Sequence, residues 1–146
     1  MEASSERRNI EVTRHGFEAY NTGDLDTLIA IVHPDVELHA DSELINGGDF
    51  RGHEGFMRWN ADWAEAWEEF RIEPRSVETF GGHCILADTH QVARGAGSGI
   101  DVEMDVFWVF EVEDDLVVRM HLYASREPAL VAVDRWRAER EARDGA

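Results

Sequence analysis

The second half of the chain alternates between apolar and polar residues in four successive runs, and this pattern constrains the fold most. The runs cover residues 70–80, 83–94, 100–112 and 116–125, and a period of two places successive side chains on opposite faces of a β-strand. They are separated by Gly81-Gly82, by a glycine-rich segment at 95–99 and by Asp114-Asp115, residue types that favour tight turns. The pattern therefore predicts an antiparallel meander of four strands.

The first half of the chain has helical spacing instead. A first helix is expected to begin near Ser4 and to end at Gly23, with Phe17 and Tyr20 on one face. A second helix is expected over residues 25–32, followed by a short strand at 36–39. Residues 41–52 hold three glycines and predict a loop with a strand fragment at 43–45, which is a candidate lid. A C-terminal helix follows Ser125, and the charged end from residue 137 is expected to fray.

A third helix is expected over residues 53–67, and it carries a stripe of four aromatic residues. Phe56, Trp59, Trp63 and Trp67 are spaced by three or four residues, so they lie on one helical face. Such a stripe is typical of a buried core, and here it is also a candidate roof for a cavity.

Helices that precede an antiparallel meander predict an α+β class, with the helices on one side of the sheet. The 146 residues contain no internal repeat and no linker, and 43% of them are apolar. A single domain over 1–146 is therefore expected, with a core at about 8–133 and a charged C-terminal tail.

The net charge of −17 excludes some partners. A chain this acidic repels phosphate backbones and anionic lipids, so neither nucleic acid nor a membrane surface is expected as a partner. The N-terminus lacks an apolar signal segment, and no run approaches the roughly 20 apolar residues of a membrane helix, so a cytoplasmic location is expected. The single cysteine, Cys84, lies in an apolar run and is expected to be buried.

Four segments resemble the SnoaL-like branch of the nuclear-transport-factor-two-like superfamily, which includes ketosteroid isomerases. They are FEAYNTGDLD at 17–26, GDFRGHEG at 48–55, EEFRIEP at 68–74 and VVRMHLY at 117–123. The resemblance implies a cone-shaped, strongly curved antiparallel sheet packed on three N-terminal helices, plus a C-terminal helix. The superfamily includes isomerases, cyclases, dehydratases and binding proteins, so the fold does not decide the function.

The turns predict which strand residues share a face. A two-residue turn at Asp114-Asp115 and a symmetric glycine loop place Asp105 beside Thr89 on the concave, apolar face. A carboxyl in an apolar cavity has a raised pKa, stays protonated and can donate a hydrogen bond to an oxyanion. Asp105 is then the main catalytic candidate, and Asp105→Asn is expected to stabilise the protein at neutral pH. A slip of one residue in either turn would exchange the faces.

The resemblance also implies where the other catalytic residues of an isomerase would lie, and this sequence has different residue types at those positions. The oxyanion-hole tyrosine position is Gly16 and the general-base position is Ala40, with His39 and Asp41 as neighbouring candidate bases. We therefore expect a cofactor-free isomerase, cyclase or lyase acting on a small apolar carbonyl compound. The alternative is a non-catalytic small-molecule binding or dimerisation domain, and the sequence leaves open whether the protein is an enzyme.

The remaining expectations concern the ligand, metals and oligomeric state. The expected ligand-binding residues face the cavity from the helices and strands; they are Tyr20, Phe56, Trp59, Trp63, Thr89, Phe107 and Met120. The sequence has no metal-ligand or phosphate-loop spacing, so no metal or cofactor is expected. Trp108, Phe110 and Tyr123 are assigned to the outer face, and this apolar surface predicts a homodimer.

Overall fold

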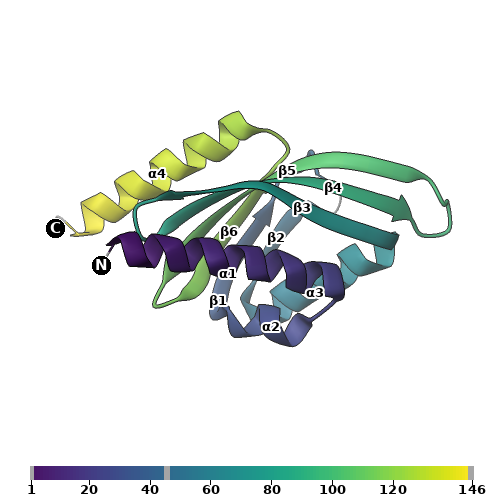
Figure 1. Cartoon of the computed structure of the whole chain (residues 1–146), viewed down its shortest axis with the longest axis horizontal. Coiled ribbons are helices and arrows are strands. Elements are labelled where there is room, and N and C mark those ends of the chain that lie inside the picture. The colour runs from purple at the N-terminus through teal and green to yellow at the C-terminus, as the bar shows by residue number, and fades with distance from the viewer. Residues whose placement is uncertain (1, 45–46, 145–146) are drawn as a thin grey trace.

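The chain folds into one six-stranded sheet with helices on both of its faces (Figure 1). The computed structural model describes residues 2–44 and 47–144. The elements in this part of the chain are α1 (Glu2–Thr22), α2 (Leu25–Ala30), β1 (Val32–Ala40), β2 (Gly48–Arg51), α3 (Gly52–Ala66), β3 (Trp67–Phe80), β4 (Cys84–Gly95), β5 (Asp101–Glu113), β6 (Leu116–Tyr123) and α4 (Arg126–Asp144). Helices α1, α2 and α3 cover one face of the sheet, and α4 covers part of the other. The α+β class and the curved sheet under three N-terminal helices are confirmed.

The N-terminal helices lie close to their expected positions. Gly23 ends α1 with φ of +74°, a conformation that glycine adopts without strain, and Asp24 then caps α2 by accepting a hydrogen bond from the Thr27 amide at 3.2 Å. Helix α3 begins one residue earlier than expected and ends at Ala66, so Trp67 is the first residue of β3. No helix within the described residues is both long and apolar enough to cross a membrane.

The sheet contains the expected meander and one parallel pair that the sequence did not predict. The strand order is β2-β1-β6-β5-β4-β3, with antiparallel pairing throughout except between β1 and β6. The second strand of the first half is β2 at Gly48–Arg51, rather than the fragment expected at 43–45; part of that fragment lies outside the described residues. Strand β1 joins the last strand of the meander because its apolar residues Leu38 and Ala40 extend the row formed by Met120 and Leu122.

A β-bulge reverses the faces that were predicted for β5. The turn at Asp114-Asp115 has two residues with φ of 51° and 65°, as expected, and Val112 pairs with Val117. The next pair is Glu111 with Arg119, however, so one extra residue of β6 bulges out. On the other side of β5, the connection from β4 is one residue longer than a symmetric glycine loop, and it pairs Thr89 with Val106.

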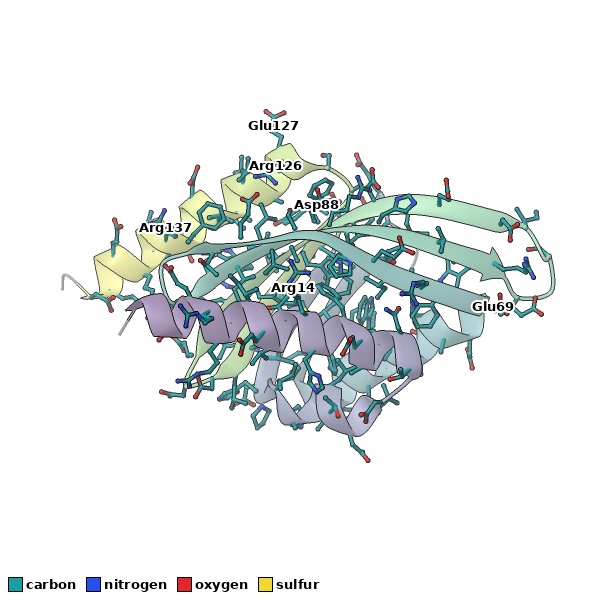
Figure 2. All side chains as sticks on the ribbon, in the orientation of Figure 1. Arg14, Glu69, Asp88, Arg126, Glu127 and Arg137 are labelled. Carbon is teal, nitrogen blue, oxygen red and sulfur yellow. The ribbon has the colours of Figure 1, made fainter. Side chains whose placement is uncertain are left out.

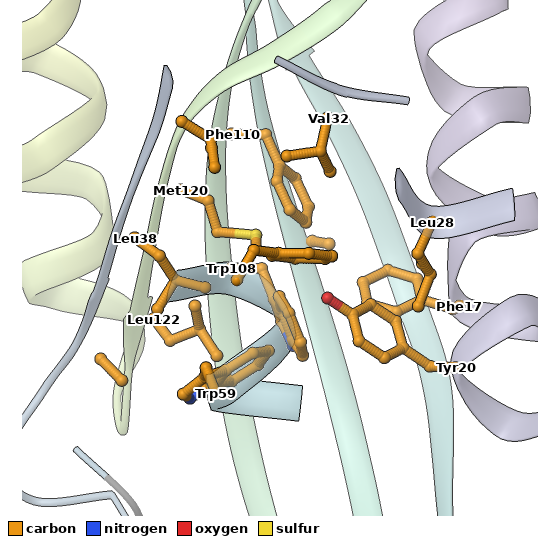
Figure 3. Close-up of a cluster of buried hydrophobic side chains, with 14 of the residues drawn as sticks. Phe17, Tyr20, Leu28, Val32, Leu38, Trp59, Trp108, Phe110, Met120 and Leu122 are labelled. Carbon is orange, nitrogen blue, oxygen red and sulfur yellow. The ribbon is translucent and has the colours of Figure 1, made fainter. Parts of the chain in front are cut away.

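The concave face under α1, α2 and α3 holds the larger part of the core. Trp108 lies at its centre, with ring centroids 5.2 Å from Phe17, 5.6 Å from Tyr20 and 6.1 Å from Trp59 (Figure 3). The expectation that Trp108 and Phe110 lie on the outer face is therefore wrong, because the bulge turns both rings into the core. The apolar surface that motivated the homodimer prediction is buried within the chain.

Helix α4 packs on the outer face against a second, smaller core. The side chains of Val133 and Trp136 are buried there against Leu86 and Val109, together with Cys84. Burial raises the pKa of the Cys84 thiol to about 11, as expected for a structural cysteine. The end of α4 continues to Asp144 rather than fraying from residue 137, because Arg140 and Arg143 form ion pairs with glutamates of β5.

Candidate functional site

Three aromatic side chains from three different elements meet inside the cone. Tyr20 comes from α1, Trp59 from α3 and Trp108 from β5, and the Tyr20 and Trp59 rings pack edge to face at 6.4 Å. Asn21 fixes the end of α1 on β3, because its side chain donates to the Ile72 carbonyl at 2.8 Å and accepts from the Ile72 amide at 2.6 Å. This anchor holds Tyr20 over the sheet, with its hydroxyl directed into the cluster toward Trp108 (Figure 3).

A first cavity of about 50 Å³ lies between α1 and the ends of β5 and β6. Its walls are mostly apolar and include Gly16, Tyr20, Phe56 and Met120. Arg8 closes its rim by donating to both carboxylate oxygens of Asp115 at 2.8 Å. Gly16 lines this cavity and, as a glycine, contributes no side chain to fill it.

A second cavity of about 20 Å³ lies on the other side of Tyr20. Trp59, Trp108 and Gln91 line it together with Tyr20. The indole nitrogen of Trp59 is buried without a hydrogen-bond partner among the described residues. Burial raises the pKa of Tyr20, so its hydroxyl stays protonated and remains a donor at neutral pH. The second cavity is therefore mostly apolar, and two residues that carry a hydrogen-bond donor, Tyr20 and Trp59, line it.

Thr89 holds the Trp108 indole by a hydrogen bond, whereas the Trp59 indole nitrogen has no hydrogen-bond partner among the described residues. The Thr89 hydroxyl donates to the Val106 carbonyl at 2.8 Å and accepts from the Trp108 indole at 3.1 Å and from the Gln91 amide at 3.4 Å. A hydroxyl with one donated and two accepted hydrogen bonds is saturated. Trp108 is therefore a fixed wall of the site.

A wide groove of about 1060 Å³ opens beside the second cavity, between α3 and the ends of β3, β4 and β5. Tyr20 and Trp63 line both the groove and the second cavity, so the groove and the cavity adjoin at these two residues. Its rim includes Glu69, at the end of β3 next to α3 (Figure 2), and Glu103 on β5.

The structure brings most of the expected ligand-binding residues together. Tyr20, Phe56, Trp59 and Met120 line the interior cavities, and Trp63 lines the groove and the second cavity. The sequence reasoning missed Gln91, although alternation from Thr89 places it on the same face, and it placed Trp108 outside. Thr89 is fully buried and acts on the site through Trp108.

Asp105 and Phe107 lie on the outer face, which corrects their expected position in the cavity. The physical reason is the register of β5, which pairs Asp105 with His90. Asp105 also forms an ion pair with Arg75, and its side chain is 48% exposed. The hydrogen bond from His90 and the charge of Arg75 lower the pKa of Asp105. The prediction that an apolar cavity raises this pKa is therefore wrong. Phe107 packs against the core under α4.

The two candidate bases also lie away from the interior cavities. The His39 imidazole Nδ1 lies 2.6 Å from the Asp49 carboxylate on the outer face, beside His121. Asp41 follows the end of β1, where its amide donates to the Leu122 carbonyl at 3.0 Å. Neither residue lines either interior cavity. The three expected catalytic residues are therefore not brought to the place where the ligand-binding residues meet.

Comparisons with known proteins agree with this architecture. A family described as the SnoaL-like domain matches residues 13–120. Among solved structures, Bal32a from a soil-derived mobile gene cassette is 20% identical with a TM-score of 0.73, covering 82% of this chain and 90% of that one. A putative SnoaL-like polyketide cyclase from Jannaschia sp. CCS1 is 19% identical with a TM-score of 0.72, covering 88% and 90%. No curated protein matches the sequence. At these identities the solved structures show similarity of fold.

Proposed function

The chain belongs to the SnoaL-like domain family, and on that premise we propose that its cone interior binds a small, mostly apolar molecule with a carbonyl group. The walls of both cavities are mostly apolar, which suits a hydrophobic ligand. The sequence alone predicted this ligand class from Asp105, and the proposal now depends on other residues.

The observation that carries the proposal is that two residues with a hydrogen-bond donor, Tyr20 and Trp59, line the second cavity. The buried Trp59 indole nitrogen has no partner within the described chain, and the Tyr20 hydroxyl points into the same cluster. A buried donor without an acceptor costs about 1–3 kcal/mol. A ligand oxygen that accepts a hydrogen bond from one of these groups would recover this energy, and a carbonyl is the acceptor that leaves the rest of the molecule apolar.

Binding requires side chains to move. The two cavities have about 50 and 20 Å³, whereas pockets for small organic ligands usually have roughly 300–1,000 Å³. Trp108 is held by Thr89, but Trp59 has no such anchor and Trp63 borders the open groove. Entry of the ligand from the groove would therefore displace the aromatic side chains of α3.

Acetophenone and ethylbenzene make a matched pair of probes for this proposal, because they differ mainly in the carbonyl group. We expect acetophenone to quench the intrinsic tryptophan fluorescence on binding, and Tyr20→Phe to weaken this binding about 5–10-fold, as loss of one hydrogen bond predicts. The same variant should leave ethylbenzene binding unchanged.

The matched control is Tyr123→Phe, since the other tyrosine of the chain lies on the outer face. This variant should bind both probes as the wild type does. Equal losses for acetophenone and ethylbenzene in Tyr20→Phe would contradict the hydrogen bond, and no binding of either probe would contradict the proposal itself.

The second candidate function is catalysis, as an isomerase, cyclase or lyase acting on the same carbonyl. A hydrogen bond from the Tyr20 hydroxyl to the carbonyl oxygen would stabilise an enolate, which favours this candidate. It also needs a base, and neither His39, Asp41 nor Asp105 lines a cavity. Exchange of the acetophenone methyl protons in D₂O, followed by NMR, separates the two functions: exchange that is lost in Tyr20→Phe supports an enzyme, and exchange at the buffer rate supports a binding protein.

A further inference from the structure

The parallel register of β1 and β6 places two histidines side by side on the outer face. His39 pairs directly with His121, and their ring centroids lie 5.1 Å apart with an angle of 57° between the planes. The two residues are far apart in the sequence, so no sequence motif indicates that they form a pair. They lie on the face opposite the cone interior and have no part in the proposed ligand site.

Each imidazole is oriented by a hydrogen bond at Nδ1. The Asp49 carboxylate lies 2.6 Å from Nδ1 of His39, and the Tyr123 hydroxyl lies 3.1 Å from Nδ1 of His121. The edge of Trp136 further fixes His121, with ring centroids 4.8 Å apart. In both rings the nitrogen left for another ligand is therefore Nε2. Histidines that bind metals typically have their second nitrogen held by a carboxylate or another polar group in this way.

We propose that His39 and His121 chelate a divalent transition-metal ion, such as Zn²⁺, Ni²⁺ or Cu²⁺, through their Nε2 atoms. Two imidazoles bound to one ion at about 2 Å place their ring centroids roughly 5 Å apart, which agrees with the observed separation. Imidazole nitrogen is a preferred ligand of these three ions. Water would complete the coordination, because no group of three or more His, Cys, Asp or Glu in the described chain is arranged to hold a metal.

The surroundings are compatible with a cation. Asp49 contributes a negative charge next to His39, and the net charge of −17 attracts cations to the molecule as a whole. Arg119 on β6 and Arg135 on α4 are the neighbouring positive groups, and the Arg119 charge is balanced by Glu111 at 3.1 Å and Glu139 at 3.3 Å. The His39 side chain is 37% exposed, so an ion can reach the pair from solution.

The test is calorimetric titration of the tag-free chain with Zn²⁺ and Ni²⁺, together with the thermal unfolding midpoint at each metal concentration. We expect one equivalent to bind in the micromolar range and to raise the midpoint, because the ion joins β1 to β6 only in the folded state. His39→Gln should reduce the affinity at least tenfold, and so should His121→Gln. His15→Gln, which removes an exposed histidine of α1, is the matched control and should bind as the wild type does.

Three results would overturn the proposal. They are the absence of binding by the wild type, unchanged binding by His39→Gln, and an equal loss in His15→Gln. If His121→Gln fails to fold, the more exposed His39→Gln still decides the outcome, and with Cu²⁺ its electron paramagnetic resonance spectrum should lose one of two nitrogen couplings. Acetophenone binding should be the same in His39→Gln and the wild type. Failure of the metal-binding proposal would therefore leave the proposed ligand site in the cone interior unaffected, and the reverse also holds.

Discussion

Asp105 forms one ion pair and one hydrogen bond on the surface of the sheet, and both depend on pH. The His90 hydrogen bond and the Arg75 charge lower its pKa, and the same hydrogen bond raises the pKa of His90. The stabilisation from Asp105 is present above the unfolded pKa of about 3.9 and is lost as the pH falls through the lower folded pKa. The stabilisation from His90 is complete below about pH 6.5 and is lost as the pH rises through its folded pKa. The pair is therefore strongest between about pH 4 and 6.5.

We predict that, between pH 2 and 8, Asp105→Asn destabilises the protein most near pH 5, less as the pH rises through the raised pKa of His90, and less as the pH falls through the lowered pKa of Asp105. The loss should be at most about 1 kcal/mol, because the carboxylate is half exposed and the ion pair is screened by water. Thermal unfolding of both proteins across this pH range measures the effect. Higher stability of the variant at neutral pH, the result expected from the sequence alone, would instead support a carboxyl buried in the cavity.

At the scale of elements, the sequence predicted the helices, strands and turns, because local residue types determine them. It did not predict the register of β5, because the register depends on pairing with the neighbouring strands. The glycines, the Asp114-Asp115 turn and the aromatic spacing of α3 act locally, so the helices and the meander could be predicted. The bulge beyond Val112 has no such local signature, because any residue of β6 can be the extra one. One extra residue on each side of β5, in the bulge of β6 and in the connection from β4, moved Asp105 out of the cavity and Trp108 into it. The fold was therefore predictable and the catalytic assignment was not.

The docking of α4 on the sheet concentrates charge around one buried carboxylate. Glu111 of β5 has a side chain that is 9% exposed, and it lies 3.1 Å from Arg119, 3.8 Å from Arg140 and 3.7 Å from Arg143. Removal of one partner from a buried ion pair leaves the others without compensation and costs about 3–5 kcal/mol. These arginines remain partly solvated, which reduces the cost.

We therefore predict that Glu111→Gln lowers the free energy of unfolding by about 2–3 kcal/mol, measured by urea denaturation. The matched control is Glu139→Gln on α4, which also pairs with Arg119 but is 49% exposed. Its loss should stay below about 1 kcal/mol. Equal effects of the two variants would show that burial of the Glu111 carboxylate does not matter for α4 docking.

For the whole molecule, α4 occupies the part of the outer face where a partner subunit could otherwise pack. The apolar residues of that face, Leu86, Phe107 and Val109, lie under α4 and contact Val133 and Trp136. The rest of the outer face, from Arg75 to Asp105, carries ion pairs and has little apolar surface. The sequence predicted a homodimer from Trp108, Phe110 and Tyr123 on this face, but Trp108 and Phe110 lie in the concave core and Tyr123 packs against the core under α4.

The prediction at this scale is that removal of residues 126–146 converts the outer face into a surface for self-association. The burial of Trp136 alone contributes roughly 4–5 kcal/mol, and a truncated chain can regain much of this energy by pairing two exposed faces. We expect light scattering at micromolar concentration to show more chains per particle for residues 1–125 than for the full-length protein.

Circular dichroism is the control for folding, because the sheet and α1 to α3 have a separate core. A folded truncated chain with the same number of subunits as the full chain would show that α4 does not shield this face. A full chain that is already a dimer, and that loses its partner only after α4 is removed, would show instead that α4 itself carries the interface.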